Sequence, residues 1–150
     1  DAFAKGGFEV PRFTEDTYKQ LAEFFNIIGG SYQNPLDMAG TVQGKLDVLD
    51  KILRIVDADP NVDAMAMETS AMFASRQWKS KPESLDEMLD TLKKHIERSA
   101  KPFVMILHPG HEAEYIASIQ PKFNERQIPT FASFERAAAA LDRAAIAAGV

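Results

Sequence analysis

Polar side chains that could hold an anion follow an apolar stretch near the middle of the chain. The run Val62–Met67 (VDAMAM) predicts a strand buried on both faces, and it leads directly into four candidate site residues, Glu68, Thr69, Ser70 and Ala71. Doubly wound sheets bind ligands at the carboxyl ends of their strands, where a helix N-terminus offers free N–H groups to an anion. We therefore expect an anion site in the segment 68–73. An ordinary strand-to-helix loop is the alternative, since Glu68 would repel phosphate.

The histidines form a second group with possible chemistry. His108, His111 and Glu112 lie in the motif HPGHE after another apolar run, and imidazole with carboxylate suits zinc or nickel. The spacing is not typical of a metal site, so a strand-end loop is the alternative interpretation. The third histidine, His95, lies in a basic stretch, and we predict that it is solvated at a helix end. Trp78 either forms an exposed contact patch or packs on its own sheet.

Apolar strands and amphipathic helices alternate along the chain and must position these groups. We expect strands at 8–13, 62–67, 102–107 and 128–131. We expect helices at 15–25, 42–56 and 111–120, one starting at Ser80 or Ser84, and a last one capped by Ser133. The pattern predicts an α/β fold with a parallel sheet covered on both faces.

Length, charge and cysteine content narrow the function classes. The 150 residues fit one domain, 1–150, and the net charge of −5 with interleaved signs argues against nucleic acid or an anionic membrane as partner. Without cysteine the chain has no disulfide, thiolate nucleophile or Cys-based zinc site, which is consistent with a cytoplasmic protein. The first residues, DAFAKGG, read as the end of a helix, so we expect a fragment of a longer chain.

Five sequence landmarks occur in a familiar order. They are FEVPRF, Asn34-Pro35-Leu36-Asp37-Met38, DADPNVDA, Lys101-Pro102 before an apolar strand, and Ile128–Phe131 before an Ala-rich helix. This order resembles the C-terminal flavodoxin-like domain of NDP-forming acyl-CoA synthetases, the superfamily of succinyl-CoA ligase and ADP-forming acetate–CoA ligase. The resemblance implies a flavodoxin-like, doubly wound parallel sheet in three α/β/α layers. The family's first strand and Ser-Gly-Gly turn are missing here.

The resemblance implies an acid–thiol ligase as the parent protein. Such synthetases work through an acyl phosphate and a phosphohistidine, and they use CoA, ATP or GTP, and Mg. The phosphohistidine, the CoA-binding Rossmann domain and the ATP-grasp domain lie outside this unit. We therefore expect no cofactor on this domain, no catalytic residue and no activity of the isolated chain. The expected partners are those other domains or subunits, with a homodimer as a further option.

The resemblance also assigns site residues. Asn34 matches an Asn near the acid substrate, and its amide could donate to a carboxylate or acyl phosphate. Alternatively, Asn34 holds its own loop. The segment matching 68–73 is Gly-rich in the family and faces the phosphohistidine, whereas this chain has Ala71 and Met72 there, which hinder close backbone approach. A non-catalytic assembly or binding domain is therefore the alternative function.

Overall fold

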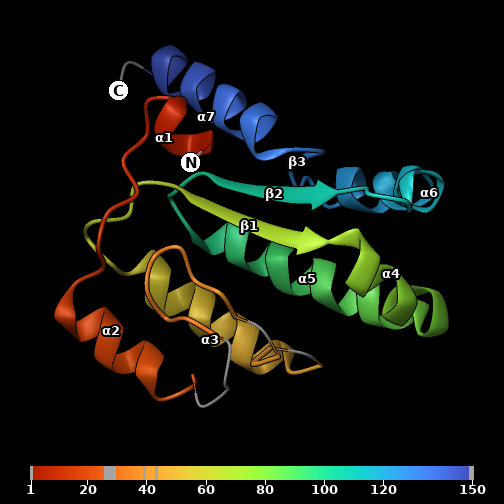
Figure 1. The fold of residues 1–150 in the computed structure, drawn as a ribbon, viewed down its shortest axis with the longest axis horizontal. Helices are drawn as coiled ribbons and strands as arrows, with labels where there is room; N and C mark the ends of the chain where they lie inside the picture. The colour runs from red at the N-terminus through yellow and green to blue at the C-terminus, as the bar shows by residue number, and fades with distance from the viewer. Residues whose placement is uncertain (1, 26–29, 39, 43, 149–150) are drawn as a thin grey trace.

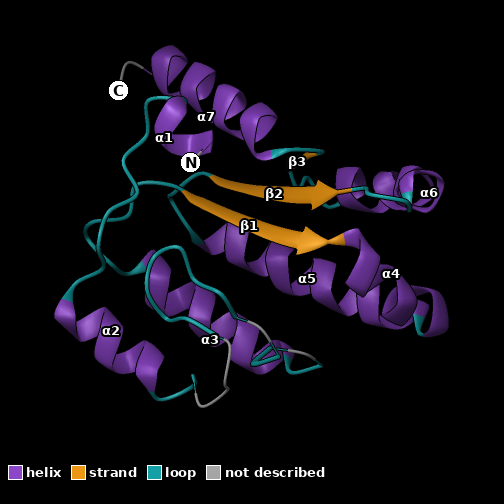
Figure 2. Ribbon diagram, in the orientation of Figure 1, coloured by secondary structure: helices purple, strands orange, loops and turns teal. Residues whose placement is uncertain are grey.

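Helices and strands alternate along the part of the chain that the computed structural model describes, residues 2–25, 30–38, 40–42 and 44–148 (Figures 1 and 2). The elements are α1 (Ala2–Lys5), α2 (Glu15–Ala22), α3 (Leu46–Asp57), β1 (Met65–Ser70), α4 (Ala71–Ser80), α5 (Pro82–Arg98), β2 (Phe103–His108), α6 (Ala113–Glu125), β3 (Thr130–Phe131) and α7 (Phe134–Ala148).

The three strands form one parallel sheet in the order β1-β2-β3. Met65 pairs with Phe103 at one end of the β1–β2 ladder and Ser70 with His108 at the other. The shorter β3 pairs with the middle of β2, Met105 opposite Thr130. Parallel pairing of the strands near Val62 and Phe103 confirms the predicted fold class, a doubly wound α/β sheet of the flavodoxin-like kind.

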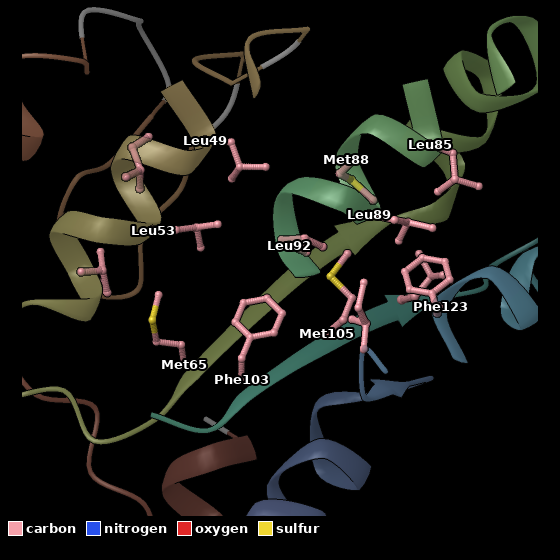
Figure 3. Close-up of a cluster of buried hydrophobic side chains, with 14 of the residues drawn as sticks. Leu49, Leu53, Met65, Leu85, Met88, Leu89, Leu92, Phe103, Met105 and Phe123 are labelled. Carbon is pink, nitrogen blue, oxygen red and sulfur yellow. The ribbon is translucent and has the colours of Figure 1, made fainter. Parts of the chain in front are cut away.

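Helices cover both faces of the sheet and make three layers (Figure 1). The larger core lies between the sheet and α3, α5 and α6. Figure 3 shows its side chains, with Leu53, Leu89 and Leu92 directed toward Met105 and Phe103 of β2. On the other face, a smaller cluster joins Val104 and Ile106 of β2 to Ala137 and Leu141 of α7 and to Phe3 of α1.

Helix α5 shows how the sequence produces this packing. Leu85, Met88, Leu89 and Leu92 recur at helical spacing and are 0–8% exposed, so they form one buried stripe. Pro82 occupies the first turn, where its missing N–H costs nothing. The helix therefore begins between the two serines that the sequence suggested as its start.

The predicted strand at 8–13 is wrong, because this segment is irregular and lies in no sheet. Local β-propensity is not sufficient here: Pro11 has no N–H to donate, and no described strand lies beside the segment. Phe13 is nevertheless buried at 6% exposure and anchors the segment to the larger core.

Two further differences concern helices. The polar segment around Trp78, for which no element was predicted, forms α4, because Ala71, Ser75 and Trp78 bury one side of it. Helix α6 continues through Pro121 to Glu125, beyond residue 120, where the sequence predicts that this helix ends. The missing hydrogen bond is tolerated because Ile119 and Phe123 on either side are buried.

Candidate functional site

The carboxyl ends of β1 and β2 meet beside the start of α4 (Figure 1). Glu68, Thr69 and Ser70 are the last residues of β1, and α4 begins at the next residue, Ala71. The alternative interpretation of 68–73 as an ordinary strand-to-helix loop is therefore wrong, since strand and helix join without a loop. The strand fixes the direction in which the helix starts, and thus the direction of its free N–H groups.

The N-terminus of α4 has the electrostatic properties of an anion site. Its N-cap, Ser70, has an extended backbone with φ −71° and ψ 118°, and its hydroxyl makes no capping hydrogen bond with the described residues. The first turn contains no acidic residue. Among the described residues, no N-cap side chain accepts from the N–H groups of this turn, and the helix dipole adds positive potential. Ala71 is fully buried, whereas Met72 is 59% exposed, so access is from the side of Met72.

Strand alternation separates the two hydroxyls of the predicted site. Side chains two apart on a strand share a face, so Glu68 and Ser70 lie on the α7 side of the sheet. His108 joins them there, because it is the register partner of Ser70. Thr69 lies on the opposite face, paired with the buried Leu107. The structure therefore brings together Glu68, Ser70 and His108, and it leaves Thr69 outside the group.

Glu68 and His108 influence one another electrostatically. Glu68 lies at the surface, yet burial of its carboxyl group against neighbouring atoms is the largest influence and raises its pKa, while His108 acts in the opposite direction. A raised pKa means that the carboxyl group of Glu68 is protonated more readily, and a protonated carboxyl group does not repel an anion. Sequence reasoning treated His108 only as a metal ligand or a loop residue, and the parallel register is what places it beside Glu68.

Asn34 lies apart from this group. Its Nδ2 donates a hydrogen bond of 2.9 Å to the carbonyl oxygen of Pro11, so it ties the loop before α3 to the segment before α2. Leu36 and Met38 of the same loop pack against the larger core. This hydrogen bond involves none of residues 68–71. These contacts favour the loop-holding interpretation of Asn34.

The HPGHE motif forms the connection between β2 and α6. Glu112 is the N-cap of α6 and its Oε2 accepts a hydrogen bond of 2.5 Å from Nζ of Lys79, which holds the pKa of Glu112 below its usual value. Within the described residues, no group of three or more His, Cys, Asp or Glu side chains is arranged to hold a metal ion. The carboxylate of Glu112 therefore links α6 to α4 through its ion pair with Lys79.

An open groove of about 310 Å³ lies where α4, α5 and α6 meet. Its lining includes Trp78, Leu85 and Ile119, together with Lys79 and Lys122 at the rim. Lys79 pairs with Glu112, and Lys122 pairs with Asp86 at 2.6 Å. Both cations are therefore already neutralised. Trp78 is only 4% exposed, so it packs within its own domain rather than forming an exposed patch.

The prediction that His95 is solvated is wrong, because its side chain is fully buried. It lies edge-on to Phe103, a residue of the larger core, with ring centroids 5.4 Å apart. Burial is the main cause that lowers its pKa, with Arg98 adding to the effect. The nearby basic residues suggested exposure, but His95 lies one turn after Leu92 on the buried stripe of α5.

Comparisons with known protein families, with curated proteins and with solved structures gave no match. The family resemblance therefore rests on the five sequence landmarks. In the part of the chain that the structure describes, each helix is too short or too polar to cross a lipid bilayer.

Proposed function

We propose that this chain is a domain of an NDP-forming acyl-CoA synthetase, an acid–thiol ligase, and that it shapes one wall of the phosphohistidine and acyl phosphate site. The observation that supports this most is the start of α4 at Ala71, directly after β1 and beside the carboxyl end of β2. Backbone N–H groups at such a helix start stabilise phosphate without supplying a reacting atom.

In this proposal the chain binds and orients an anion and does not react with it. The hydroxyl of Ser70 and the first-turn N–H groups of α4 donate to the anion, and His108 lies beside Glu68 on the same face of the sheet. CoA, ATP or GTP, and Mg belong to the CoA-binding Rossmann and ATP-grasp domains of the parent protein. A cytoplasmic location is part of the same proposal.

A second function, that of a non-catalytic assembly domain, is favoured by two observations. Asn34 uses its amide to hold its own loop, so it does not stand ready for a substrate. The helix start has Ala71 fully buried and a carboxylate two residues before the N-cap, both of which oppose the approach of phosphate. In this function the sheet and its helices serve only to bind partner domains.

Titration of the isotope-labelled chain with inorganic phosphate and with acetyl phosphate, followed by NMR, separates the two functions. The first predicts saturable shifts of the amide signals of Ala71 and Met72. The variant Glu68→Gln should bind more tightly and Ser70→Ala more weakly. Glu83→Gln, in the first turn of α5, is the matched control and should bind like the natural chain. Shifts that stay linear with anion concentration in all four proteins would support the assembly function.

A further inference from the structure

The carboxylate of Glu112 holds α4 at two points. It accepts a hydrogen bond from Nζ of Lys79 and another from the hydroxyl of the buried Ser75. Ser75 and Lys79 are four residues apart, so they lie one turn from each other on the same side of α4. Ala71, the first residue of the helix, lies one turn before Ser75 on that side. A single row of residues therefore runs from the start of α4, the candidate site, to Glu112.

The main chain fixes the position of this carboxylate. The N–H of Glu112 donates to the carbonyl oxygen of Pro109 over 2.8 Å, and its own carbonyl accepts from the N–H of Ile116 over 2.9 Å. Gly110, inside this turn, has φ +50°, in the left-handed region that favours glycine. The carboxylate therefore extends from a backbone that is hydrogen-bonded on both sides.

The HPGHE motif lies beside both ends of α4. His108, its first residue, is the register partner of Ser70, the N-cap of α4. Glu112, its last residue, pairs with Lys79 in the last turn of α4. The negative charge of Glu112 lies at the N-terminus of α6 and the positive charge of Lys79 at the C-terminus of α4, so each also interacts favourably with its own helix dipole.

Apolar packing alone leaves the direction of α4 open. Trp78 buries one side of the helix, but the hydrophobic effect is non-directional. Hydrogen bonds depend on angle, so the contacts of Ser75 and Lys79 with Glu112 restrict the tilt of the helix axis. Lys79 lies about 12 Å along the helix from Ala71, so a shift of about 1 Å at Lys79 turns the axis by about 5°. The N–H groups of the first turn move with that axis.

We propose that Glu112 is a positioning residue for the anion site: through Ser75 and Lys79 it sets the direction in which the first-turn N–H groups of α4 point. This inference rests on the anion-binding function proposed above, because it names a residue outside the site that adjusts it. Hydrogen bonds weaken when donor and acceptor are out of line, so the affinity for an anion depends on this direction. Glu112 itself does not touch the anion.

Residual dipolar couplings test the positioning, because they measure N–H directions without any ligand. Glu112→Ala removes both contacts to α4 but no helix cap, since this side chain makes no capping hydrogen bond. In this variant the couplings of Ala71 and Met72 should change relative to those of β2. Lys79→Ala should produce a smaller change in the same direction, and Lys79→Arg, which retains the ion pair, should resemble the natural chain.

The affinity for inorganic phosphate is the second measurement. Glu112→Ala should weaken it by about 2- to 30-fold, the range for residues that influence a site without touching it. Lys79→Ala should weaken it too, but should add little when Glu112→Ala is already present, because both variants remove the same ion pair. A general loosening of the fold would give additive losses instead, without recovery in Lys79→Arg.

Lys122→Ala is the matched control. It breaks the ion pair with Asp86 on the same groove, and the two lysine side chains have similar exposure, 40% for Lys122 and 48% for Lys79. The couplings of α4 and the phosphate affinity should stay unchanged. The proposal is overturned if Glu112→Ala alters neither measurement, or if Lys122→Ala alters both equally. A natural chain that does not bind phosphate would contradict the anion-binding function alone, since the couplings decide the positioning without ligand.

Discussion

Arg98 donates a hydrogen bond of 3.3 Å from Nη2 to Nδ1 of His95, the buried histidine of α5. A guanidinium has no acceptor, so Nδ1 must be the unprotonated nitrogen and Nε2 carries the hydrogen. That Nε2 is buried and has no hydrogen-bond partner among the described residues. Protonation of Nδ1 would replace this hydrogen bond with repulsion between two cations.

The chain should therefore lose stability in mild acid through His95. Its folded-state pKa lies below the ordinary 6.5, so the unfolded state binds more protons as the pH falls below that value. The free energy of unfolding should drop by at most about 1.4 kcal/mol per pH unit, until the folded-state pKa is reached. Urea unfolding between neutral pH and pH 5 measures this, with His95→Leu expected to flatten the profile.

His111→Leu is the control for that profile, because His111 is exposed. It should keep the acid-side loss of the natural chain. Asp50 and Asp59 also have lowered pKa values: burial alone would raise each, but hydrogen bonds to the carboxylates outweigh it. Their stabilisation is lost only as the pH falls below the ordinary 3.8, so it contributes little to the change measured between neutral pH and pH 5.

Asp50 should prove more important than the surface pair it also forms. Its Oδ1 accepts a hydrogen bond of 2.5 Å from Nη1 of Arg98 and so ties α3 to α5. Asp50→Ala should lower the free energy of unfolding by about 1–2 kcal/mol, since the pair is partly exposed. Arg54→Ala removes only the 61% exposed partner and should cost less than about 0.5 kcal/mol. Equal losses in thermal unfolding would contradict this ranking.

Phe123 should be the most costly single side chain to shorten on α6. It is fully buried, between the sheet and α5, so Phe123→Ala leaves a cavity and should destabilise the chain by about 3–5 kcal/mol. Ile146→Ala, at 69% exposure on α7, should stay within about 0.5 kcal/mol of the natural chain. Denaturant midpoints compare the two variants directly.

Asn34 should act on local order rather than on ligand binding. Asn34→Ala removes the hydrogen bond to Pro11 and should cost about 1 kcal/mol of stability. Amide hydrogen exchange should become faster from Phe8 to Phe13, while β2 stays protected. Gln33→Ala, at the exposed neighbouring position, should leave exchange unchanged. If Asn34→Ala instead weakens phosphate binding and leaves exchange unaltered, the loop-holding role is wrong.

The sequence was sufficient for the features that depend on periodicity. The apolar runs and helical stripes predicted β1, β2 and α5, and hence the parallel sheet, because buried strands and amphipathic helices leave strong local patterns. The segment 8–13 also contains apolar residues and forms no strand, since a strand exists only where a neighbour can accept its hydrogen bonds. That neighbour is a property of the whole fold and not of six residues.

The candidate site was predictable only in part, for the same reason. Glu68 and Ser70 follow an apolar run and could be placed at the carboxyl edge of the sheet. The contribution of His108 depends on the β1–β2 register, and the burial of His95 depends on which face α5 turns inward. The basic residues near His95 in the sequence suggested exposure, but Lys94 points to solvent and Arg98 donates to the buried ring of His95.

The burial of Trp78 gives the chain a built-in optical reporter. It is the only tryptophan among the 150 residues, and it sits on α4, the helix whose first turn forms the candidate site. The fluorescence emission of this indole therefore reports on the packing of α4 against α5 and α6 without any added label. A red shift with quenching signals water reaching the indole, so loosening of this helix can be followed separately from unfolding of the rest of the chain.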